Sequence, residues 1–309
     1  MTLAAVDPSK LKVGLNIPNG DGSMTPTANR WKDVLELAVA AERAGLDSVW
    51  VADHMIFDFP DVPIQGRWEC WTLLSAIAQA TTRVEIGPLV ACAGFRNPAL
   101  LAKMAETLDE VSDGRLILAL GAGWHEPEFT TYGFPYDKRA SRFEEAFHVI
   151  RHLVRDGYVD FTGQFVSAPN CYLRPRGPRN GKLPLMIGTD GPRMLELAAR
   201  HADIWNTTWT RSVEEALPRL AALDVACDNV GRDRDSIGRS VCVFLDLPGA
   251  VGVWLNGKVS TPHPLSTEEA AEFLAGYAAA GVEHVMLWTD PFTVEAIEQA
   301  GEVIRLLRS

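Results

Sequence analysis

The stretch GRLILALGAGWHEPEF (114–129) holds the features from which we infer the fold and the site. Its apolar residues 116–120 lead directly into Gly121-Ala122-Gly123. After the glycines stand one aromatic and three ionisable residues: Trp124, His125, Glu126 and Glu128. A continuous apolar run of this length is typical of a strand buried on both faces, as in a parallel sheet covered by helices. The glycines and the polar residues then lie at the carboxyl end of that strand.

Apolar runs of the same kind recur along the chain and alternate with longer segments of helical periodicity. The predicted strands are 11–17, 48–53, 84–90, 115–121, 183–188, 202–206, 239–246 and 283–289. The predicted helices are 29–44, 69–80, 98–112, 138–156, 190–201, 212–230, 266–280 and 292–308. Eight strand–helix units in series predict an α/β protein of the (β/α)8 TIM-barrel class, because no second domain interrupts the rhythm. We therefore expect one domain over residues 1–309.

Three connections are too long to be plain loops of a barrel. They are 122–137 after the fourth strand, 157–182 before the fifth and 248–264 after the seventh. The second of these is predicted to contain a small hairpin that turns at Gly163. In a barrel of this class the active site is built from the loops at the carboxyl ends of the strands. Residues directly after strands are therefore the candidates for function.

The composition excludes several classes of protein. A net charge of −11 argues against nucleic-acid binding, because phosphates would be repelled. No apolar run reaches ~18 residues, so we expect no membrane span, and residues 1–10 lack the pattern of a signal peptide. The five cysteines are scattered, with neither a disulfide framework nor metal-ligand spacing. We expect a globular protein of the cytoplasm that acts on a small molecule.

The second and third predicted strands carry residues that suggest chemistry. Asp53 and His54 follow the second strand, where they could form a general acid–base pair or contact a cofactor. The alternative is a histidine that caps the next loop. The third strand contains Gly87 and Pro88. Since proline cannot donate to a strand ladder, these residues predict a bulge, either as a bend of the barrel or as space for a flat ligand ring.

The fifth predicted strand ends at Gly188-Thr189-Asp190-Gly191, and the helix that follows has Pro192 in its first turn. Free N–H groups and the helix dipole favour an anion of the size of a phosphate at this position. The alternative is an ordinary helix with Asp190 as its N-cap. The loop lacks the lysine of a nucleoside-triphosphate loop. Together with the glycines at 121 and 123, which we expect to let a ligand lie against the backbone, the pattern fits a phosphorylated ring cofactor.

Three blocks of sequence resemble the bacterial luciferase-like oxidoreductase family. They are FRNPALLAKMAETLDEVSDGRLILALGAGWHEPEF (95–129), YGFPYDKRASRFEEAF (132–147) and LPLMIGTDGPRMLELAARHADIWN (183–206). The resemblance begins at about Leu11 and weakens after residue 210. It implies a (β/α)8 barrel, usually a homodimer, that holds either FMN or the deazaflavin coenzyme F-420. It also implies a flavin reductase or an F-420-reducing dehydrogenase as the functional partner.

The same resemblance implies roles for individual residues. His54 would be catalytic, and Asp53 would contact the ring system of the cofactor. A non-prolyl cis peptide is implied at the bulge, around Leu89–Val90–Ala91. The other residues implied to bind the cofactor are Leu89, Val90, Cys92, Ala122, Gly123, Gly188, Thr189, Asp190 and Gly191.

The motifs ADH (52–54) and GAGWHEPEF (121–129) are most similar to the deazaflavin subgroup of the family. This similarity implies hydride transfer, with His54 donating or accepting the accompanying proton. One alternative is an FMN-dependent two-component monooxygenase that uses oxygen. Another is a non-catalytic flavin-binding protein, in which residues 248–264 would plug the pocket. The anionic tail of the deazaflavin needs cations, which the basic run 174–182 or else Lys103 and Arg139 could supply.

The substrate pocket is predicted from ring-bearing residues near strand ends: Phe57, Trp68, Trp124 and His125. They indicate a hydrophobic or ring-containing substrate, although aromatic residues also pack barrels. The family's deazaflavin-dependent sugar-phosphate dehydrogenases carry a carboxylate where this chain has Trp124, which argues against such a substrate. A metal-dependent hydrolase would need ligands at several strand ends, and only Asp53/His54 and His125/Glu126 offer any. We therefore predict no metal site.

Overall fold

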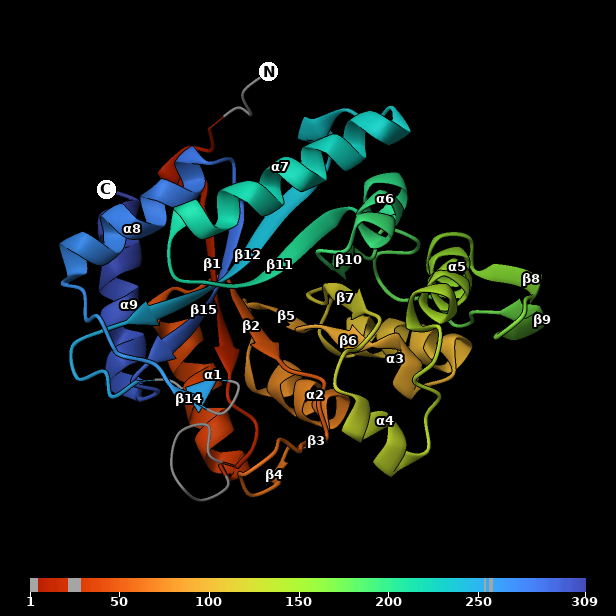
Figure 1. Ribbon diagram of the computed structural model, residues 1–309, viewed down its shortest axis with the longest axis horizontal. Coiled ribbons are helices and arrows are strands. Elements are labelled where there is room, and N and C mark those ends of the chain that lie inside the picture. Colours follow the sequence, from red (N-terminus) through yellow and green to blue (C-terminus); the bar gives the residue numbers. More distant parts are fainter. Residues whose placement is uncertain (1–4, 22–28, 253, 256–257) are drawn as a thin grey trace.

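The structure is a computed structural model that describes residues 5–21, 29–252, 254–255 and 258–309. A parallel barrel forms its centre and helices surround it, as predicted (Figure 1). The strands neighbour one another in the order β5-β2-β1-β15-β12-β11-β10-β7-β6. Their bounds are β1 Lys12–Ile17, β2 Ser48–Val51, β5 Glu85–Pro88, β6 Ala91–Cys92, β7 Leu118–Gly121, β10 Leu185–Gly188, β11 Ile204–Thr210, β12 Gly238–Asp246 and β15 His284–Asp290.

The barrel closes through the third predicted strand, which is split into two halves. Its first half, β5, pairs with β2, and its second half, β6, pairs with β7 on the other side. A further parallel bridge joins Ile86 to Leu116. Nine strand segments therefore occupy the eight strand positions of a (β/α)8 barrel. The peptide bond between Leu89 and Val90, in the gap between the halves, is cis, which confirms the predicted cis peptide.

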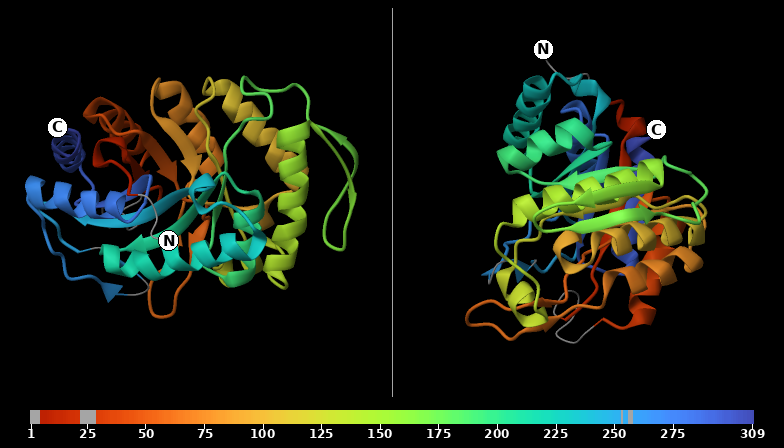
Figure 2. Two further views of the ribbon diagram at one scale, coloured as in Figure 1. Left: turned by 90° about the horizontal axis from the view of Figure 1, so that it is seen from above. Right: turned by 90° about the vertical axis from the view of Figure 1, so that its right-hand side faces the viewer.

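The helices lie on the outer face of the barrel (Figure 2). Each turns an apolar stripe towards the strands; α1 buries Val34, Leu37 and Ala41 and ends at Gly45, which has a φ of 95°. Their bounds are α1 Trp31–Ala44, α2 Cys70–Ala80, α3 Pro98–Val111, α4 Glu126–Tyr132, α5 Arg139–Asp156, α6 Pro192–His201, α7 Val213–Val230, α8 Thr267–Ala279 and α9 Val294–Leu307, with the short 3-10 turns η1 Pro8–Lys10, η2 Ala93–Phe95 and η3 Arg234–Ser236. Among the described residues, no helix combines the length and the apolar character needed to cross a membrane.

The strands have two buried faces, which explains their continuous apolar sequences. Along β1, Val13, Leu15 and Ile17 belong to the core between the strands and the helices. Residues 14 and 16 point the other way, into the barrel, because side chains alternate along a strand. A second cluster fills the barrel interior: Trp50, Ile117, Ala119, Met186, Cys242 and Met286. The interior is thus packed core, and a ligand must bind at the rim.

Short extra elements interrupt the alternation of strands and helices. Residues 157–182 contain the predicted hairpin, formed by β8 (Tyr158–Thr162) and β9 (Ser167–Tyr172), with Gly163 at its turn. The connection 122–137 contains α4, and 248–264 contains β13 (Trp254–Leu255) and β14 (Lys258–Val259). A hairpin of β3 (Ile56–Phe57) and β4 (Gln65–Gly66) follows β2. The sequence does not predict it, because two-residue strands show no periodicity.

Candidate active site

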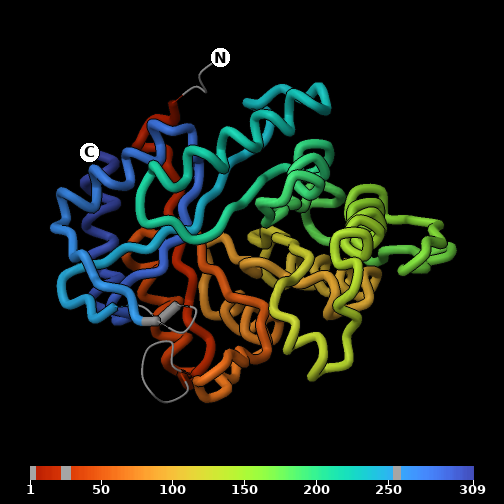
Figure 3. Tube along the Cα trace, in the orientation of Figure 1, coloured from red at the N-terminus to blue at the C-terminus, as the bar shows by residue number. Residues whose placement is uncertain are grey.

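Two connections meet at the carboxyl ends of β2 and β7. The segment 53–69 after β2 and the segment 122–137 after β7 lie side by side, although they are far apart in the sequence (Figure 3). His54 begins the first segment, and α4 lies in the second. Hydrogen bonds between the two segments determine how His54 is held.

A buried carboxylate holds His54. The Nδ1 atom of His54 lies 2.7 Å from Oε2 of Glu128, and the two side chains are 19% and 1% exposed. The other carboxylate oxygen of Glu128 accepts the backbone N–H of Met55 at 2.6 Å and that of Ile56 at 3.2 Å. An ionised carboxylate can only accept, so Nδ1 of His54 donates. The Nε2 atom is then the nitrogen that a substrate can reach.

His125 forms a hydrogen bond with the backbone of the segment that follows β2. Its Nε2 accepts the backbone N–H of Asp58 at 3.0 Å, and only 5% of the residue is exposed. Burial lowers the pKa of His125 from its ordinary value, so the ring is neutral at pH 7 and carries its proton on Nδ1. His125 and Glu128 together attach the start of α4 to residues 54–58. This attachment explains why ionisable groups follow the glycines of β7.

Aromatic rings gather around His54. The cluster consists of the rings of His54, Phe57, Phe59, Trp124 and His125. The ring centres of His54 and Phe57 are 4.4 Å apart, those of His54 and Trp124 5.6 Å, and those of Phe57 and Trp124 6.0 Å. Trp124 is 51% exposed, so part of its indole is open to an incoming molecule. The structure thus brings together three of the four residues predicted to line the substrate pocket.

The fourth, Trp68, has a different partner, and among the described residues no ring contact joins it to this cluster. Its indole N–H donates to the carbonyl of Asn29 at 2.6 Å, and the residue is 51% exposed. The neighbouring Arg67 covers Phe57, with its guanidinium carbon 4.7 Å from the ring centre. Three groups accept from that guanidinium: the carbonyls of Asp21 and Gly66 and the side chain of Gln65. The cation beside the aromatic cluster is therefore already hydrogen-bonded.

Asp53 holds the second half of the split strand. Its carboxylate accepts from the guanidinium of Arg96 at 2.6 and 2.9 Å and from the backbone N–H of Cys92 at 2.9 Å. Asp53 is only 4% exposed. Burial and the charge of Asp53 raise the pKa of the Cys92 thiol to about 12, so this cysteine is a neutral wall residue. The implied contact of Asp53 with a cofactor ring stays a prediction, and these bonds show what the carboxylate does within the protein.

The glycines at the ends of β7 and β10 leave room for the side chain of Val90, and the expected contact of a ligand with the backbone at Gly121 and Gly123 stays a prediction. A Cβ at Gly121 would lie 2.7 Å from a methyl group of Val90. A Cβ at Gly188 would lie 3.0 Å from the other methyl group of the same side chain. The side chain of Val90 therefore occupies the space between the ends of β7 and β10.

Gly123 is required by packing in the same way. Its φ is 75°, and a Cβ there would lie 2.6 Å from both Cys92 Sγ and the ring of Phe129. Two neighbours of these buried groups are partly exposed: Ala122 and Leu89. Together with Val90, which is also partly exposed, they are the surface of the bulge that a ligand can contact.

The start of α6 has no cap from Asp190, which was the alternative interpretation of this turn. The N-cap residue is Gly191, and no described side chain caps the helix. The carboxylate of Asp190 instead accepts from Thr207 Oγ1 and lies 3.8 Å from the guanidinium of Arg219. The backbone N–H of Gly191 donates to Thr189 Oγ1 at 3.3 Å, and a Cβ at Gly191 would meet nothing within 4 Å. A helix start without a side-chain cap, with open space beside Gly191, fits a phosphate.

A buried acceptor without a partner lies inside the barrel. Asn16 is 1% exposed and, by the alternation along β1, points inward. Its Oδ1 accepts no hydrogen bond from any described residue. Buried oxygens are rarely left unpaired in folded proteins. A flat cofactor with a ring N–H, bound at the rim, would satisfy this atom, so the residues present fit such a group.

Comparison with known proteins shows to which family the chain belongs. A family model described as luciferase-like monooxygenase matches residues 11–246. The chain belongs to the luciferase-like monooxygenase family. A phthiodiolone/phenolphthiodiolone dimycocerosates ketoreductase of Mycobacterium sp. (strain JLS) is 32% identical over 257 residues, which is 75% of this chain and 66% of that relative. An F-420-dependent glucose-6-phosphate dehydrogenase of Amycolatopsis mediterranei (strain U-32) is 35% identical over 191 residues, 59% of this chain and 55% of that relative.

The matches cover less than two thirds of the length of both relatives. Among solved structures, an F-420-dependent secondary alcohol dehydrogenase in complex with an F-420–acetone adduct superposes with a TM-score of 0.79 at 22% identity. That superposition covers 97% of this chain and 99% of the other, and it shows that the two proteins share the luciferase-like fold.

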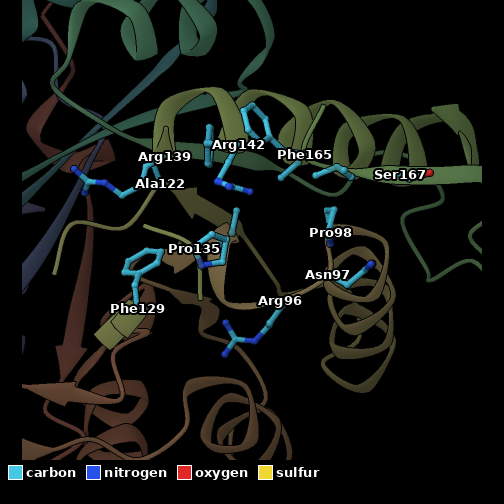
Figure 4. A pocket seen from close by; sticks show the side chains of 15 residues that line it. Arg96, Asn97, Pro98, Ala122, Phe129, Pro135, Arg139, Arg142, Phe165 and Ser167 are labelled. Atoms are coloured by element: carbon cyan, nitrogen blue, oxygen red, sulfur yellow. The ribbon is translucent and has the colours of Figure 1, made fainter. Parts of the chain in front are cut away.

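A lateral cavity of about 240 Å³ lies beside the rim of the luciferase-like barrel (Figure 4). Residues of η2, the starts of α3 and α5 and the β8–β9 turn line it, and it reaches Ala122. Arg139 donates to the carbonyl of Gly123 at 2.7 Å, and Arg142 forms an ion pair with Asp137 at 2.9 Å. Within the described part of the chain Arg139 has no carboxylate partner. The cavity therefore has a net positive lining next to the end of β7.

Arg139, one of the cations expected for the cofactor tail, lines the lateral cavity. Sequence reasoning assigned no role to three other residues that build the site: Asn16, Arg96 and Glu128. The last two lie inside the sequence blocks that resemble the family, so the motifs indicated their importance but not their partners. Asn16 gave a different signal, because it is a polar residue at an inward position of an otherwise apolar strand.

Proposed function

We propose that the chain is an oxidoreductase that transfers hydride between coenzyme F-420 and a small, uncharged carbonyl compound or alcohol. The observation that carries the proposal is His54, a half-buried imidazole at a barrel strand end, with aromatic rings around it and no hydrogen bond from its Nε2 to any described residue. The similarity to a ketoreductase and to a secondary alcohol dehydrogenase supports the carbonyl–alcohol pair. A hydrophobic or ring-containing body of the substrate suits the aromatic cluster.

The residues at the rim would hold the cofactor in three places. Four side chains would form the wall against its flat ring: Leu89, Val90, Cys92 and Ala122. The Oδ1 atom of Asn16 would accept from a ring N–H, and Asp53 would keep β6 in place through Cys92. The uncapped start of α6, with residues 188–191, would bind the phosphate. When bound, the deazaflavin supplies hydride in two-electron steps.

The chain's own side chains would then complete the reaction. His54 would donate a proton to the substrate oxygen, or accept one from it, through Nε2. Phe57 and Trp124 would exclude water and contact the apolar body of the substrate. In this proposal the loop 122–137 both covers the site and positions the histidine.

Two observations favour an uncharged substrate. The guanidinium of Arg67 already donates to groups of the protein, so it offers no free cation to a phosphate. Position 124 carries an indole and not a carboxylate base. A sugar phosphate is therefore not the substrate class we propose, although one relative carries that name.

The proposal is tested by mixing the protein anaerobically with reduced F-420 and a panel of aliphatic, cyclic and aryl ketones. We expect the visible absorbance of the oxidised coenzyme to return, and His54→Ala to abolish this turnover while cofactor binding is retained. Turnover only with reduced FMN and oxygen would assign the two-component monooxygenase instead. Tight cofactor binding without turnover of any compound would favour the non-catalytic flavin-binding protein.

The family resemblance supports further proposals about the cellular context. We infer a homodimer of the cytoplasm that folds as one domain over residues 1–309. An F-420-reducing dehydrogenase would supply its reduced cofactor, with a flavin reductase in that place if the cofactor is FMN. The net charge of −11 supports a small-molecule partner over a nucleic acid.

A further inference from the structure

Glu128 connects α4 to the segment that carries His54. It lies in the first turn of α4, and its carboxylate is 1% exposed. One oxygen accepts from Nδ1 of His54, and the other accepts from the backbone N–H groups of Met55 and Ile56. Both oxygens of this buried carboxylate are therefore satisfied, and all three contacts are to the three-residue stretch 54–56.

We propose that Glu128 is a positioning residue of the site, which sets the proton position on His54. This inference rests on the proposed function for its kinetic part. The carboxylate requires the proton of the neutral ring on Nδ1, which leaves the Nε2 lone pair directed away from Glu128. It also stabilises the imidazolium form by its negative charge, without itself taking up a proton.

The proton balance shows why this tautomer matters. In carbonyl reduction the substrate carbon would gain a new C–H bond from the hydride, while a C–H bond of the reduced deazaflavin breaks and the deazaflavin is oxidised by two electrons. The π electrons of the C=O bond would move to the oxygen. The imidazolium of His54 gives its Nε2 proton to that oxygen, which completes an O–H bond. The ring is left neutral, with its remaining proton on Nδ1 and still bonded to Glu128. Alcohol oxidation is the reverse, with the Nε2 lone pair as the base.

The variant Glu128→Gln distinguishes two roles of Glu128: setting the tautomer of His54, and holding the loop through the backbone of Met55 and Ile56. The amide oxygen of the glutamine can still accept from Met55 and Ile56, which fixes the side chain and turns its NH₂ group towards Nδ1 of His54. An NH₂ group only donates, so Nδ1 must accept and the neutral ring must carry its proton on Nε2. The variant is thus expected to reverse the tautomer while the loop contacts stay in place.

The experiment measures ¹⁵N chemical shifts of histidine-labelled protein, with the His54 signals assigned by loss in His54→Gln. We expect the neutral wild-type ring to be protonated on Nδ1 and the Glu128→Gln ring on Nε2. Glu126→Gln, an exposed residue of the same helical turn, is the matched control and should leave the tautomer unchanged. In steady-state assays Glu128→Gln should lower kcat by about 10²–10³-fold, with KM and cofactor affinity nearly unchanged.

Several results would overturn the inference. One is an Nε2-protonated ring in the wild type, which needs no variant to be folded. Another is an unchanged tautomer in Glu128→Gln, and a third is a reversed tautomer without loss of kcat. If no substrate of the proposed class is turned over, the proposed function fails, and the tautomers still decide whether Glu128 positions His54.

Discussion

At the scale of single residues, Val90 determines which side chains the neighbouring strand ends can carry. We predict that Gly121→Ala lowers the free energy of unfolding by about 1–3 kcal/mol, the usual cost of overpacking a core. The reason is the 2.7 Å separation between the added Cβ and the Val90 methyl group. Urea denaturation of the two proteins measures the difference.

A double variant, Gly121→Ala with Val90→Ala, tests whether contact with Val90 causes this loss of stability. In a Val90→Ala background the methyl group is absent, so Gly121→Ala should cost much less, and the two changes should not be additive. An equal cost in both backgrounds would show that Val90 is not the group in conflict.

His284 makes stability depend on pH. It is buried, its Nε2 lies 2.7 Å from Ser48 Oγ, and burial lowers the pKa of His284 from 6.5 to about 3. The folded ring stays neutral while the unfolded ring takes up a proton below pH 6.5, so stability is lost as the pH falls from 6.5 towards 3. We predict that His284 contributes about 2 kcal/mol to the fall in the free energy of unfolding between pH 7.5 and pH 5.

Denaturation curves of the wild type and His284→Asn at both pH values measure this contribution. The variant is expected to be less stable at pH 7.5, but its stability should change less between the two pH values. Parallel changes in the two proteins would mean that other groups cause the pH dependence.

Residue types at the strand ends could be predicted, but their partners could not. The rule that barrel sites lie at carboxyl ends selected Asp53 and His54. Their partners, Arg96 and Glu128, are 43 and 74 positions away and belong to other connections. Asp190 shows the same limit, because its carboxylate accepts from Thr207 of the next strand, a partner that the local sequence does not reveal.

At the scale of elements, the start of α5 brings a cation to the rim. Two cations of the basic run 174–182 already have partners, because Arg176 pairs with Glu106 and Arg179 with Asp109 on α3. Arg139 instead lines the lateral cavity. We predict that Arg139→Gln weakens binding of F-420 about tenfold, the effect of losing roughly one charge-assisted hydrogen bond to the anionic tail.

Binding titrations with F-420 and with FMN check this prediction. FMN lacks the tail, so its affinity should change much less than that of F-420. Arg151→Gln, on the same helix but outside the cavity lining, is the control and should leave both affinities unchanged. An equal loss for both cofactors would place Arg139 at a group that they share.

Periodicity predicted the long elements well and the short ones poorly. The eight strands and eight main helices lie within a few residues of their predicted bounds, because each shows an apolar pattern over several turns or residues. The second strand was predicted to end at residue 53, but β2 ends at Val51. The sixth strand was predicted to end at residue 206, but β11 continues to Thr210. The α4 helix and the β3–β4 hairpin were missed because tertiary contacts, such as those of Glu128, hold them.

At the scale of the whole molecule, the order of eight strand–helix units was sufficient to predict the barrel. It was not sufficient to predict how the barrel closes, since the split third strand pairs on both sides across Leu89 and Val90. Because the third strand is split, its bulge lies at the same rim of the barrel as His54 and the start of α6, which has no side-chain cap. The proposed function therefore requires a flat, phosphate-bearing redox cofactor that binds this rim.

The most direct test of that claim is a titration of the purified protein with F-420 and with FMN, followed by absorbance and fluorescence. We predict saturable binding of F-420 and of FMN at one site, with a clearly lower Kd for F-420. Tighter binding of FMN would contradict the assignment of the cofactor. Absence of binding by either would contradict the account of the rim itself.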